Sequence, residues 1–323
     1  MPHKVTGVVF MKQWGIALGA GGILGFAHIG VLEALEARGL KPGFVAGTSA
    51  GAIIGGLWAS GVKLSSIKAQ METLALDQSA AALYAQNGAP AHSVSPMALQ
   101  GLLGTGWIES IFRRVTGNKM MSDVEVPLAI VSCDLYTGDI VVFTNRPPGP
   151  RFLERTILEG PTGLSRRYVT GVPLATAIMA SCALPGVFVP KKVYDYQLVD
   201  GGVKEMVPAY EVRRMGAEEV LSVDLGWHID RAREVKGLYS VLSRSFNLAT
   251  RRATLEHLKQ YSSMTLSPQV WEPGLPTPAK IRALVEAGRR CAEKHMGKWI
   301  DRIGWQEIRL PEGKGLPGDR IIG

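Results

Sequence analysis

The fold is decided by the stretch Phe44-Val45-Ala46-Gly47-Thr48-Ser49-Ala50-Gly51, in which a short apolar run meets a serine between two glycines and continues into an apolar segment. This order predicts a buried strand, a sharp turn and a helix. The same order occurs just before it, where an apolar run is followed by Gly19-Ala20-Gly21-Gly22-Ile23-Leu24-Gly25 and an apolar helix that stops at Gly39. Two such units in succession predict neighbouring parallel strands with helices packed on the sheet.

The rest of the chain continues this alternation. Segments of helical composition occupy 63–116, 174–181, 238–261 and 278–295, and short apolar runs that predict strands occur at 127–132, 140–144, 193–199, 219–224 and 264–266. We predict a hairpin for the first two of these strands and a loop over 147–163. The predicted fold class is therefore α/β, a three-layer sandwich with a mostly parallel central sheet flanked by helices.

Composition excludes several classes of protein. With 323 residues, 46% of them hydrophobic and 20% charged, the chain can bury a core, unlike a disordered chain. Cys133, Cys182 and Cys291 are an odd number without the spacing of a zinc site or a disulfide framework, so we expect no metal and a reducing compartment. No signal-peptide pattern precedes Trp14, and glycines interrupt the nearly uncharged run up to Leu32, so we expect a cytoplasmic protein that neither is secreted nor spans a membrane.

The net charge of +8 bears on possible partners. Basic residues cluster at 151–167, 231–236 and 251–252, where we expect solvated surfaces; the alternative is transient peripheral contact with an anionic membrane, at its inner face. No nucleic-acid-binding motif accompanies the clusters, so no nucleic-acid partner is expected. The sequence leaves the oligomeric state open.

Ser49 is a candidate nucleophile. Gly47 and Gly51 permit a sharp turn that presents its hydroxyl at the start of a helix, where developing negative charge is favoured. The earlier glycine-rich loop is the matching candidate for an oxyanion hole. Its candidate donors are the backbone amides of Gly19, Ala20, Gly21 and Gly22. The alternatives for this loop are a structural turn and a dinucleotide-binding loop, and the second lacks the acidic residue expected after the next strand.

A serine hydroxyl needs a base that removes its proton. Two histidines are candidates, although packing or capping explains His28 better, and His228 follows the predicted strand at 219–224. Asp200 is the third candidate, because Gly201 and Gly202 let the backbone turn sharply just after a strand. An aspartate before two glycines is also a common turn, so this pattern alone does not decide between the three.

Together and in this order, the motifs resemble the patatin-like phospholipase family, in particular its small bacterial members. The matching pieces are G-A-G-G-x-x-G at Gly19–Gly25, H-I-G-V-L at His28–Leu32, G-T-S-A-G at Gly47–Gly51, A-S-C-A-L-P-G-V-F-V-P at Ala180–Pro190 and D-G-G at Asp200–Gly202. The resemblance implies a Ser–Asp dyad in which Ser49 is the nucleophile and Asp200 the proton acceptor. It also implies oxyanion donors chiefly at Gly21 and Gly22, and neither a metal nor a cofactor.

The activity implied by the resemblance is hydrolysis of lipid carboxylic esters, such as phospholipids, lysophospholipids or neutral acyl esters, through an acyl-enzyme. Acyl transfer to another alcohol would use the same intermediate. The implied organisation is an N-terminal extension at 1–13, a patatin-like catalytic domain at 14–226 with a helical insertion at 63–116, and C-terminal helices at 227–323 that pack on the same domain.

Two residues depart from the family pattern. Ala20 stands where the family usually has glycine, and Leu24 where it usually has a basic residue. These departures keep open the alternative of a catalytically weak lipid-binding or regulatory protein. Two further alternatives are a nicotinamide-dependent oxidoreductase, suggested by the early glycines alone, and a conventional esterase with His228 as its base.

Overall fold

A computed structural model describes residues 12–86, 106–148, 155–159, 165–226, 238–270 and 276–305. The strands are β1 (Trp14–Leu18), β2 (Phe44–Thr48), β3 (Leu128–Asp134), β4 (Ile140–Thr144), β5 (Arg155–Glu159), β6 (Ser165–Val169), β7 (Lys191–Val193), β8 (Tyr196–Asp200), β9 (Glu219–Val223) and β10 (Met264–Leu266). The α-helices are α1 (Phe26–Glu36), α2 (Ala50–Ala59), α3 (Leu64–Gln86), α5 (Gly106–Val115), α6 (Leu174–Ser181), α7 (Ala209–Arg214), α8 (Leu238–Tyr261) and α9 (Pro278–Ile303). Short 3-10 helices include η1 (Gly22–Gly25), η3 (Met121–Asp123) and η4 (Gly201–Val203).

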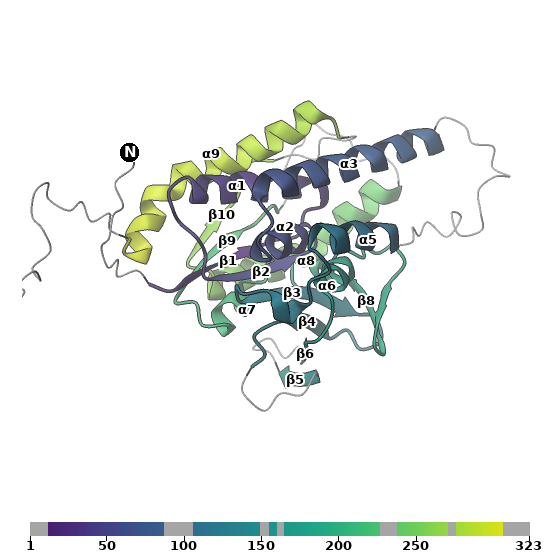
Figure 1. The fold of residues 1–323 in the computed structure, drawn as a ribbon, viewed down its shortest axis with the longest axis horizontal. Helices are drawn as coiled ribbons and strands as arrows, with labels where there is room; N and C mark the ends of the chain where they lie inside the picture. Colours follow the sequence, from purple (N-terminus) through teal and green to yellow (C-terminus); the bar gives the residue numbers. More distant parts are fainter. Residues whose placement is uncertain are drawn as a thin grey trace, which may run out of the picture.

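The ten strands of the described residues form one sheet in the order β10-β9-β1-β2-β3-β4-β6-β5, with β8 attached to β3 and β7 attached to β8. Five of the nine strand pairings in the described residues are parallel, including those that join β10, β9, β1, β2 and β3. Helices cover the sheet, and Figure 1 shows α1, α3 and α9 lying on one side of the strands. The predicted α/β fold with a mostly parallel sheet flanked by helices is confirmed.

Alternation along β1 shows how the sequence builds three layers. Ile16 and Leu18 belong to one buried cluster, which includes apolar side chains of α1, α2 and α9. Ala17, which points to the opposite face, belongs to a second buried cluster with side chains of α7 and α8. Because successive strand residues face opposite sides of a sheet, these two clusters are the two interfaces of the sandwich.

The feature that positions the functional site is a change of partner along one edge of β3. β2 pairs in parallel with Leu128–Val131, and its last residue, Thr48, lies opposite Val131. β8 pairs antiparallel with the next residues of β3, and Asp200 lies opposite Ser132. Since β4 occupies the other edge of β3 at these positions, β8 continues the edge where β2 ends. The end of β2 and the end of β8 therefore meet head to head.

The structure corrects two expectations from the sequence. The predicted loop over 147–163 contains β5, which pairs antiparallel with β6, another strand that was not predicted. Arg166, in a basic cluster expected on solvated surfaces, is 2% exposed and forms ion pairs with Glu205 and Glu211. The consecutive arginines Arg166 and Arg167 occupy both faces of β6 and obscure the apolar alternation that would otherwise reveal this strand.

The C-terminal part contributes to the same layers. β10 pairs with β9, and α9 packs along α1. Helix α9 extends past the predicted end at residue 295 to Ile303, where Gly304 ends it with a φ of 69°. The proposed domain boundaries themselves stay predictions. None of the described helices is both long enough and apolar enough to cross a membrane.

Candidate active site

Ser49 lies in the sharp turn between β2 and α2. Its φ of 54° and ψ of −119° place it in a region that residues with side chains rarely adopt. The flanking glycines allow the close packing of this turn: a Cβ on Gly47 would lie 2.4 Å from the carbonyl oxygen of Gly51, and one on Gly51 would lie 2.0 Å from that of Leu18. Strain of this kind persists only where the surrounding structure fixes it, and it is concentrated at functional sites.

Asp200 is the side chain that the change of partner on β3 brings to Ser49. It is 3% exposed, and its carboxylate accepts hydrogen bonds from the Ser49 side chain and, at 2.8 Å, from the Gly202 amide. Burial raises the pKa of Asp200 to about 6, and the two hydrogen bonds oppose this rise. A carboxylate that changes protonation near neutral pH, in contact with a serine hydroxyl, is suited to proton transfer.

The two glycines after Asp200 allow close packing on both sides. A Cβ on Gly201 would lie 2.2 Å from the carbonyl oxygen of Val131, so only glycine fits against β3. A Cβ on Gly202 would lie 3.0 Å from the Asp200 carboxylate and 3.4 Å from the Cβ of Ala20. The D-G-G motif therefore brings Asp200, the strand and the glycine-rich loop into contact.

Two of the four amides predicted as oxyanion donors already have backbone acceptors. The amide of Gly19 donates to the Val223 carbonyl at 3.0 Å, and the amide of Ala20 donates to the Met206 carbonyl at 2.8 Å. These two amides anchor the loop and are not available to a substrate. Within the described part of the chain, the amides of Gly21 and Gly22 have no backbone acceptor. Gly22 is exposed and has a φ of 52°.

The departures from the family pattern have local explanations. Ala20 does not have a positive φ, so the backbone there does not require glycine. Leu24 is partly buried and packs against the core that includes α1 and α2. Gly25 lies against the start of α2, where an added Cβ would come within 2.5 Å of the Cβ of Ala50. The glycine-rich loop is thus packed directly on the helix that follows Ser49.

His28 supports this loop and is not placed as a base. It is fully buried on α1, and its Nε2 lies 2.8 Å from the carbonyl oxygen of Gly19. Burial lowers the pKa of His28 to about 4, so the neutral ring donates this hydrogen bond at neutral pH. His228, the other candidate base, lies outside the described residues.

Two residues that the sequence analysis did not single out hold the backbone of Ser49. The amide of Ser49 donates to the hydroxyl of Ser181 at 2.9 Å, and this buried hydroxyl donates to the Val131 carbonyl at 2.6 Å. On the other side, the thiol of Cys182 lies 3.3 Å from the carbonyl oxygen of Ser49. Burial raises the pKa of Cys182 well above its ordinary value, so this thiol stays protonated. Both residues lie in the A-S-C-A-L-P-G run, which carried the resemblance without an assigned role.

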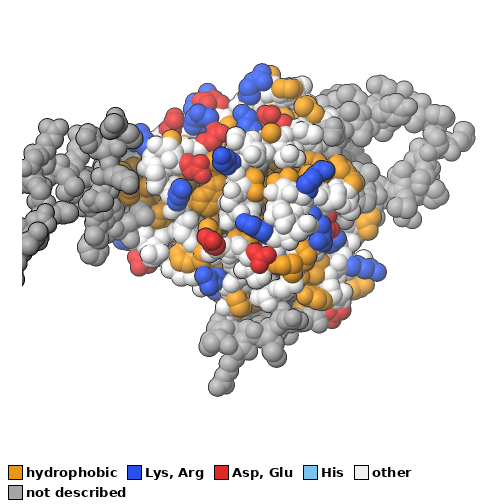
Figure 2. Space-filling view, viewed as in Figure 1, with side chains coloured by type: hydrophobic (Ala, Val, Ile, Leu, Met, Phe, Trp, Pro, Cys, Tyr) orange, Lys and Arg blue, Asp and Glu red, His pale blue; other side chains and the backbone are white. Residues whose placement is uncertain are grey.

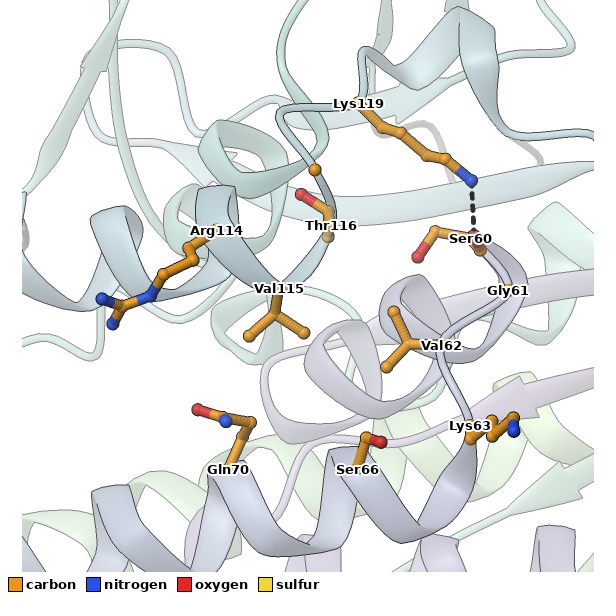
Figure 3. A pocket seen from close by; sticks show the side chains of 11 residues that line it. Ser60, Gly61, Val62, Lys63, Ser66, Gln70, Arg114, Val115, Thr116 and Lys119 are labelled. Carbon is orange, nitrogen blue, oxygen red and sulfur yellow. Dashed lines mark hydrogen bonds between the residues drawn. The ribbon is translucent and has the colours of Figure 1, made fainter.

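A cavity of about 600 Å³ lies away from these residues, between the end of α2, the start of α3 and the end of α5. Figure 3 shows Val62, Val115 and Gln70 around it, with the Lys119 ammonium donating to the Ser60 carbonyl at 2.7 Å. Ser49 lies at the other end of α2, about 15 Å away at the helical rise per residue. Helices α2 and α5 both have their C-terminal ends at this cavity. The partial negative charge of a helix C-terminus would oppose a developing oxyanion, so we assign no catalytic role to this cavity.

Among the described residues, no cluster of His, Cys, Asp or Glu is arranged to hold a metal ion. The arrangement at Ser49 consists of a strained serine at the start of a helix, a buried carboxylate in contact with its hydroxyl, and unoccupied amides on an adjacent loop. Acyl transfer by a serine requires a nucleophile, a base and oxyanion donors, and these three groups are of the chemical types that fill those roles.

Comparison with known proteins agrees with this arrangement. A family model described as patatin-like phospholipase matches residues 16–213. An uncharacterized NTE family protein of Mycobacterium tuberculosis is 29% identical over 217 residues, which cover 65% of this chain and 48% of the relative. Human patatin-like phospholipase domain-containing protein 6 is 28% identical over 211 residues, 65% of this chain and 13% of the relative.

Lysophospholipase NTE1 of Mycosarcoma maydis is 26% identical over 212 residues, 66% of this chain and 10% of the relative. Among solved structures, VipD from Legionella pneumophila has the same fold, with a TM-score of 0.52 at 12% identity over 90% of this chain and 67% of VipD. The chain thus spans about half the length of the mycobacterial relative and a smaller part of the human and fungal ones. Because the family model matches more than half of the chain, the protein belongs to the patatin-like phospholipase family.

Proposed function

We propose that this protein is a serine acyl hydrolase that cleaves lipid carboxylic esters through a Ser49–Asp200 dyad. The observation that carries the proposal is the contact between the Ser49 hydroxyl and a buried carboxylate whose pKa is raised to about 6. At neutral pH, Asp200 is ionised and is able to accept the serine proton without the help of a histidine.

In the acylation step, Ser49 Oγ forms a bond to the acyl carbon as its proton passes to Asp200. The amides of Gly21 and Gly22 stabilise the negative charge that develops on the carbonyl oxygen, a contribution of about 3 kcal/mol per donor in related sites. The positive end of α2 acts in the same direction. When the intermediate collapses, the bond to the alcohol breaks and Asp200 returns the proton to the departing alkoxide.

In the deacylation step, Asp200 accepts a proton from water, whose oxygen attacks the acyl carbon. The bond to Ser49 breaks, the carboxylic acid leaves, and the proton returns to Ser49 Oγ. An alcohol in place of water would give acyl transfer by the same steps. Ser181, which accepts from the Ser49 amide, and Cys182, which donates to the Ser49 carbonyl, keep the Ser49 backbone in place throughout.

The substrate class is proposed from the family and from the names of relatives, one of which is a lysophospholipase. A phospholipid, a lysophospholipid or a neutral acyl ester fits the proposed chemistry equally. We propose the cytoplasmic location that the sequence predicts, with transient peripheral contact with a membrane.

The test is hydrolysis of a short-chain p-nitrophenyl ester by the wild type, Ser49→Ala and Asp200→Asn, each checked for folding by circular dichroism. We expect turnover by the wild type and none above background by either folded variant. Full activity of Asp200→Asn would refute the dyad. A wild type that hydrolyses neither this ester nor lipids would favour the lipid-binding alternative.

His228→Ala is the matched control in this assay. The proposal predicts an unchanged rate, because Asp200, which is hydrogen-bonded to Ser49, is the proposed base. Loss of activity in this variant, with retained folding, would move the base to His228.

A further inference from the structure

Exposed apolar side chains gather at one end of the molecule. Eight large hydrophobic side chains are exposed in the described residues, and five of them lie in three segments around β8. We call these five the apolar rim: Trp107, Leu135, Tyr136, Val189 and Tyr194. Their exposed fractions run from 39% for Val189 to 71% for Tyr136, and a cluster of this kind on a soluble surface marks an interaction site.

Hydrogen bonds and an ion pair connect the three segments that carry these side chains. The turn after β3 is bound to β8, because the Leu135 amide donates to the Gln197 carbonyl at 2.9 Å and the Gln197 amide donates to the Asp134 carboxylate at 3.0 Å. The start of α5 is bound to β7 by the ion pair between Glu109 and Lys191. The rim is therefore held by hydrogen bonds and an ion pair and does not consist of independent loops.

The rim projects from the edge of the sheet that carries the candidate active site. Ser132, opposite Asp200, is level with Ser49, and Leu135 lies three residues further along β3, a distance of about 10 Å. Tyr194 lies six residues before Asp200 on the β7–β8 hairpin, about 20 Å beyond it along an extended strand. The rim therefore lies within about 20 Å of Ser49, in the direction in which the β7–β8 hairpin extends away from Asp200.

Charges around the rim favour an anionic surface. Lys192 and Lys204 are exposed beside it. Three acidic side chains near the rim are neutralised. Glu109 is paired with Lys191 and Arg113, Asp139 is paired with Arg167, and Asp134 is buried and accepts hydrogen bonds. Figure 2 shows apolar side chains interspersed with Lys and Arg over the region of α5 and β8.

We propose that the apolar rim docks on a lipid bilayer that carries anionic headgroups and so presents Ser49 to ester bonds at the membrane surface. This inference rests on the proposed function for its purpose, but vesicle binding is independent of catalysis. Tyrosine and tryptophan place an apolar ring and a polar tip at the membrane interface, and lysine extends its ammonium group toward headgroups. The exposed lysines beside the rim and the net charge of +8 favour an anionic bilayer over a second copy of this chain, because like charges repel.

The test uses Ser49→Ala as the background, so that no product accumulates on the vesicles. Binding is measured by co-sedimentation with phosphatidylcholine vesicles, with and without phosphatidylglycerol. Leu135→Ser is compared with the matched variant Leu255→Ser, since the two leucines are 51% and 49% exposed and Leu255 lies on α8 outside the rim. Loss of a buried leucine contact should weaken binding about tenfold for Leu135→Ser, and Leu255→Ser should leave it unchanged.

A combined Tyr136→Ser and Tyr194→Ser variant should weaken binding further, and vesicles without phosphatidylglycerol should bind less protein. In the Ser49 wild-type background, the rim variants should hydrolyse a soluble short-chain ester at the normal rate and an ester in vesicles more slowly. Equal binding by Leu135→Ser and Leu255→Ser, or binding only to a second copy of the chain in sedimentation without vesicles, would overturn the proposal. An inactive wild type that still binds vesicles through the rim would refute only the proposed function.

Discussion

Asp200 and Glu205 are two buried carboxylates close together in the chain, and their surroundings move their pKa values in opposite directions. They are 3% and 5% exposed, so burial acts on both to raise the pKa. For Asp200, only hydrogen bonds oppose burial, and the pKa rises to about 6. For Glu205, burial is again the largest single influence, but the charges and hydrogen bonds of Arg166 and His257 together outweigh it, and the pKa falls to about 2.

The difference lies in the presence of a cation. Arg166 from β6 lies 2.7 Å from Glu205 and 2.8 Å from Glu211, and its guanidinium group stacks on the ring of Tyr210. Asp200 faces a hydroxyl and an amide instead. Depth of burial therefore does not determine what a carboxylate does: the same depth gives a fixed ion pair at Glu205 and a group able to exchange a proton at Asp200.

The largest expected effect is that of Asp200→Asn, which should lower ester hydrolysis by a factor of about 1000 because the base is lost.

The same variant should not lose stability at neutral pH. Because the folded-state pKa of Asp200 lies above its ordinary value, the ionised group destabilises the fold above about pH 6. Urea unfolding at about pH 8 should show Asp200→Asn to be more stable, by up to about 3 kcal/mol. A less stable variant would contradict the assignment.

Glu205→Gln should do the reverse and lower the free energy of unfolding by about 3 kcal/mol at neutral pH, since it removes one anion from a buried ion pair. The folded-state pKa is lowered, so the stabilisation by Glu205 is present above its ordinary pKa and is lost as pH falls toward about 2. The gap between wild type and variant in urea unfolding should therefore narrow in acid. Ester hydrolysis by folded protein should change little, because Thr48 is bonded to the Glu205 backbone carbonyl, which the variant keeps.

The control for Glu205→Gln is Glu256→Gln. Glu256 pairs with Arg252 on α8, but the two side chains are 68% and 91% exposed. Exposed pairs contribute little, so unfolding should shift by less than about 0.5 kcal/mol. Equal losses in the two variants would show that burial has no part in the effect.

A smaller effect is expected for Ser181→Ala, which changes neither carboxylate. It removes the acceptor for the Ser49 amide and leaves the Val131 carbonyl without its donor. We expect about a tenfold loss of kcat with little change in KM, from a misplaced nucleophile. The pH at half-maximal rate should stay at the wild-type value, and a shifted pH profile would mean that Ser181 acts through Asp200.

The sequence was informative where function and fold impose a local pattern. Ser49 between glycines, the D-G-G motif after Val199 and the bounds of α6 and α8 could all be predicted from short windows. The contact between Ser49 and Asp200 depended on the resemblance, because it arises from the change of partner along β3, which no local pattern records.

The buried ion cluster could not be predicted in this way. Arg166, Glu205 and Glu211 come from β6, the loop after η4 and α7, and each segment alone has the composition of a solvated surface. Burial of a charge becomes evident only when its partner is known, and the partner here is far away in the chain. The same holds for Ser181, whose role depends on the tertiary approach of α6 to the turn at Ser49.

The central claim is that Asp200 activates Ser49, and the most direct test is the pH dependence of covalent labelling. A fluorophosphonate would be added to the wild type, Ser49→Ala and Asp200→Asn, and the adduct located and timed by mass spectrometry. We predict one adduct at Ser49 in the wild type, forming at a rate that rises through about pH 6 and levels off above it, as Asp200 loses its proton. Both variants should remain unlabelled on this time scale. Labelling of Asp200→Asn at the wild-type rate, or an adduct at another residue, would contradict the account.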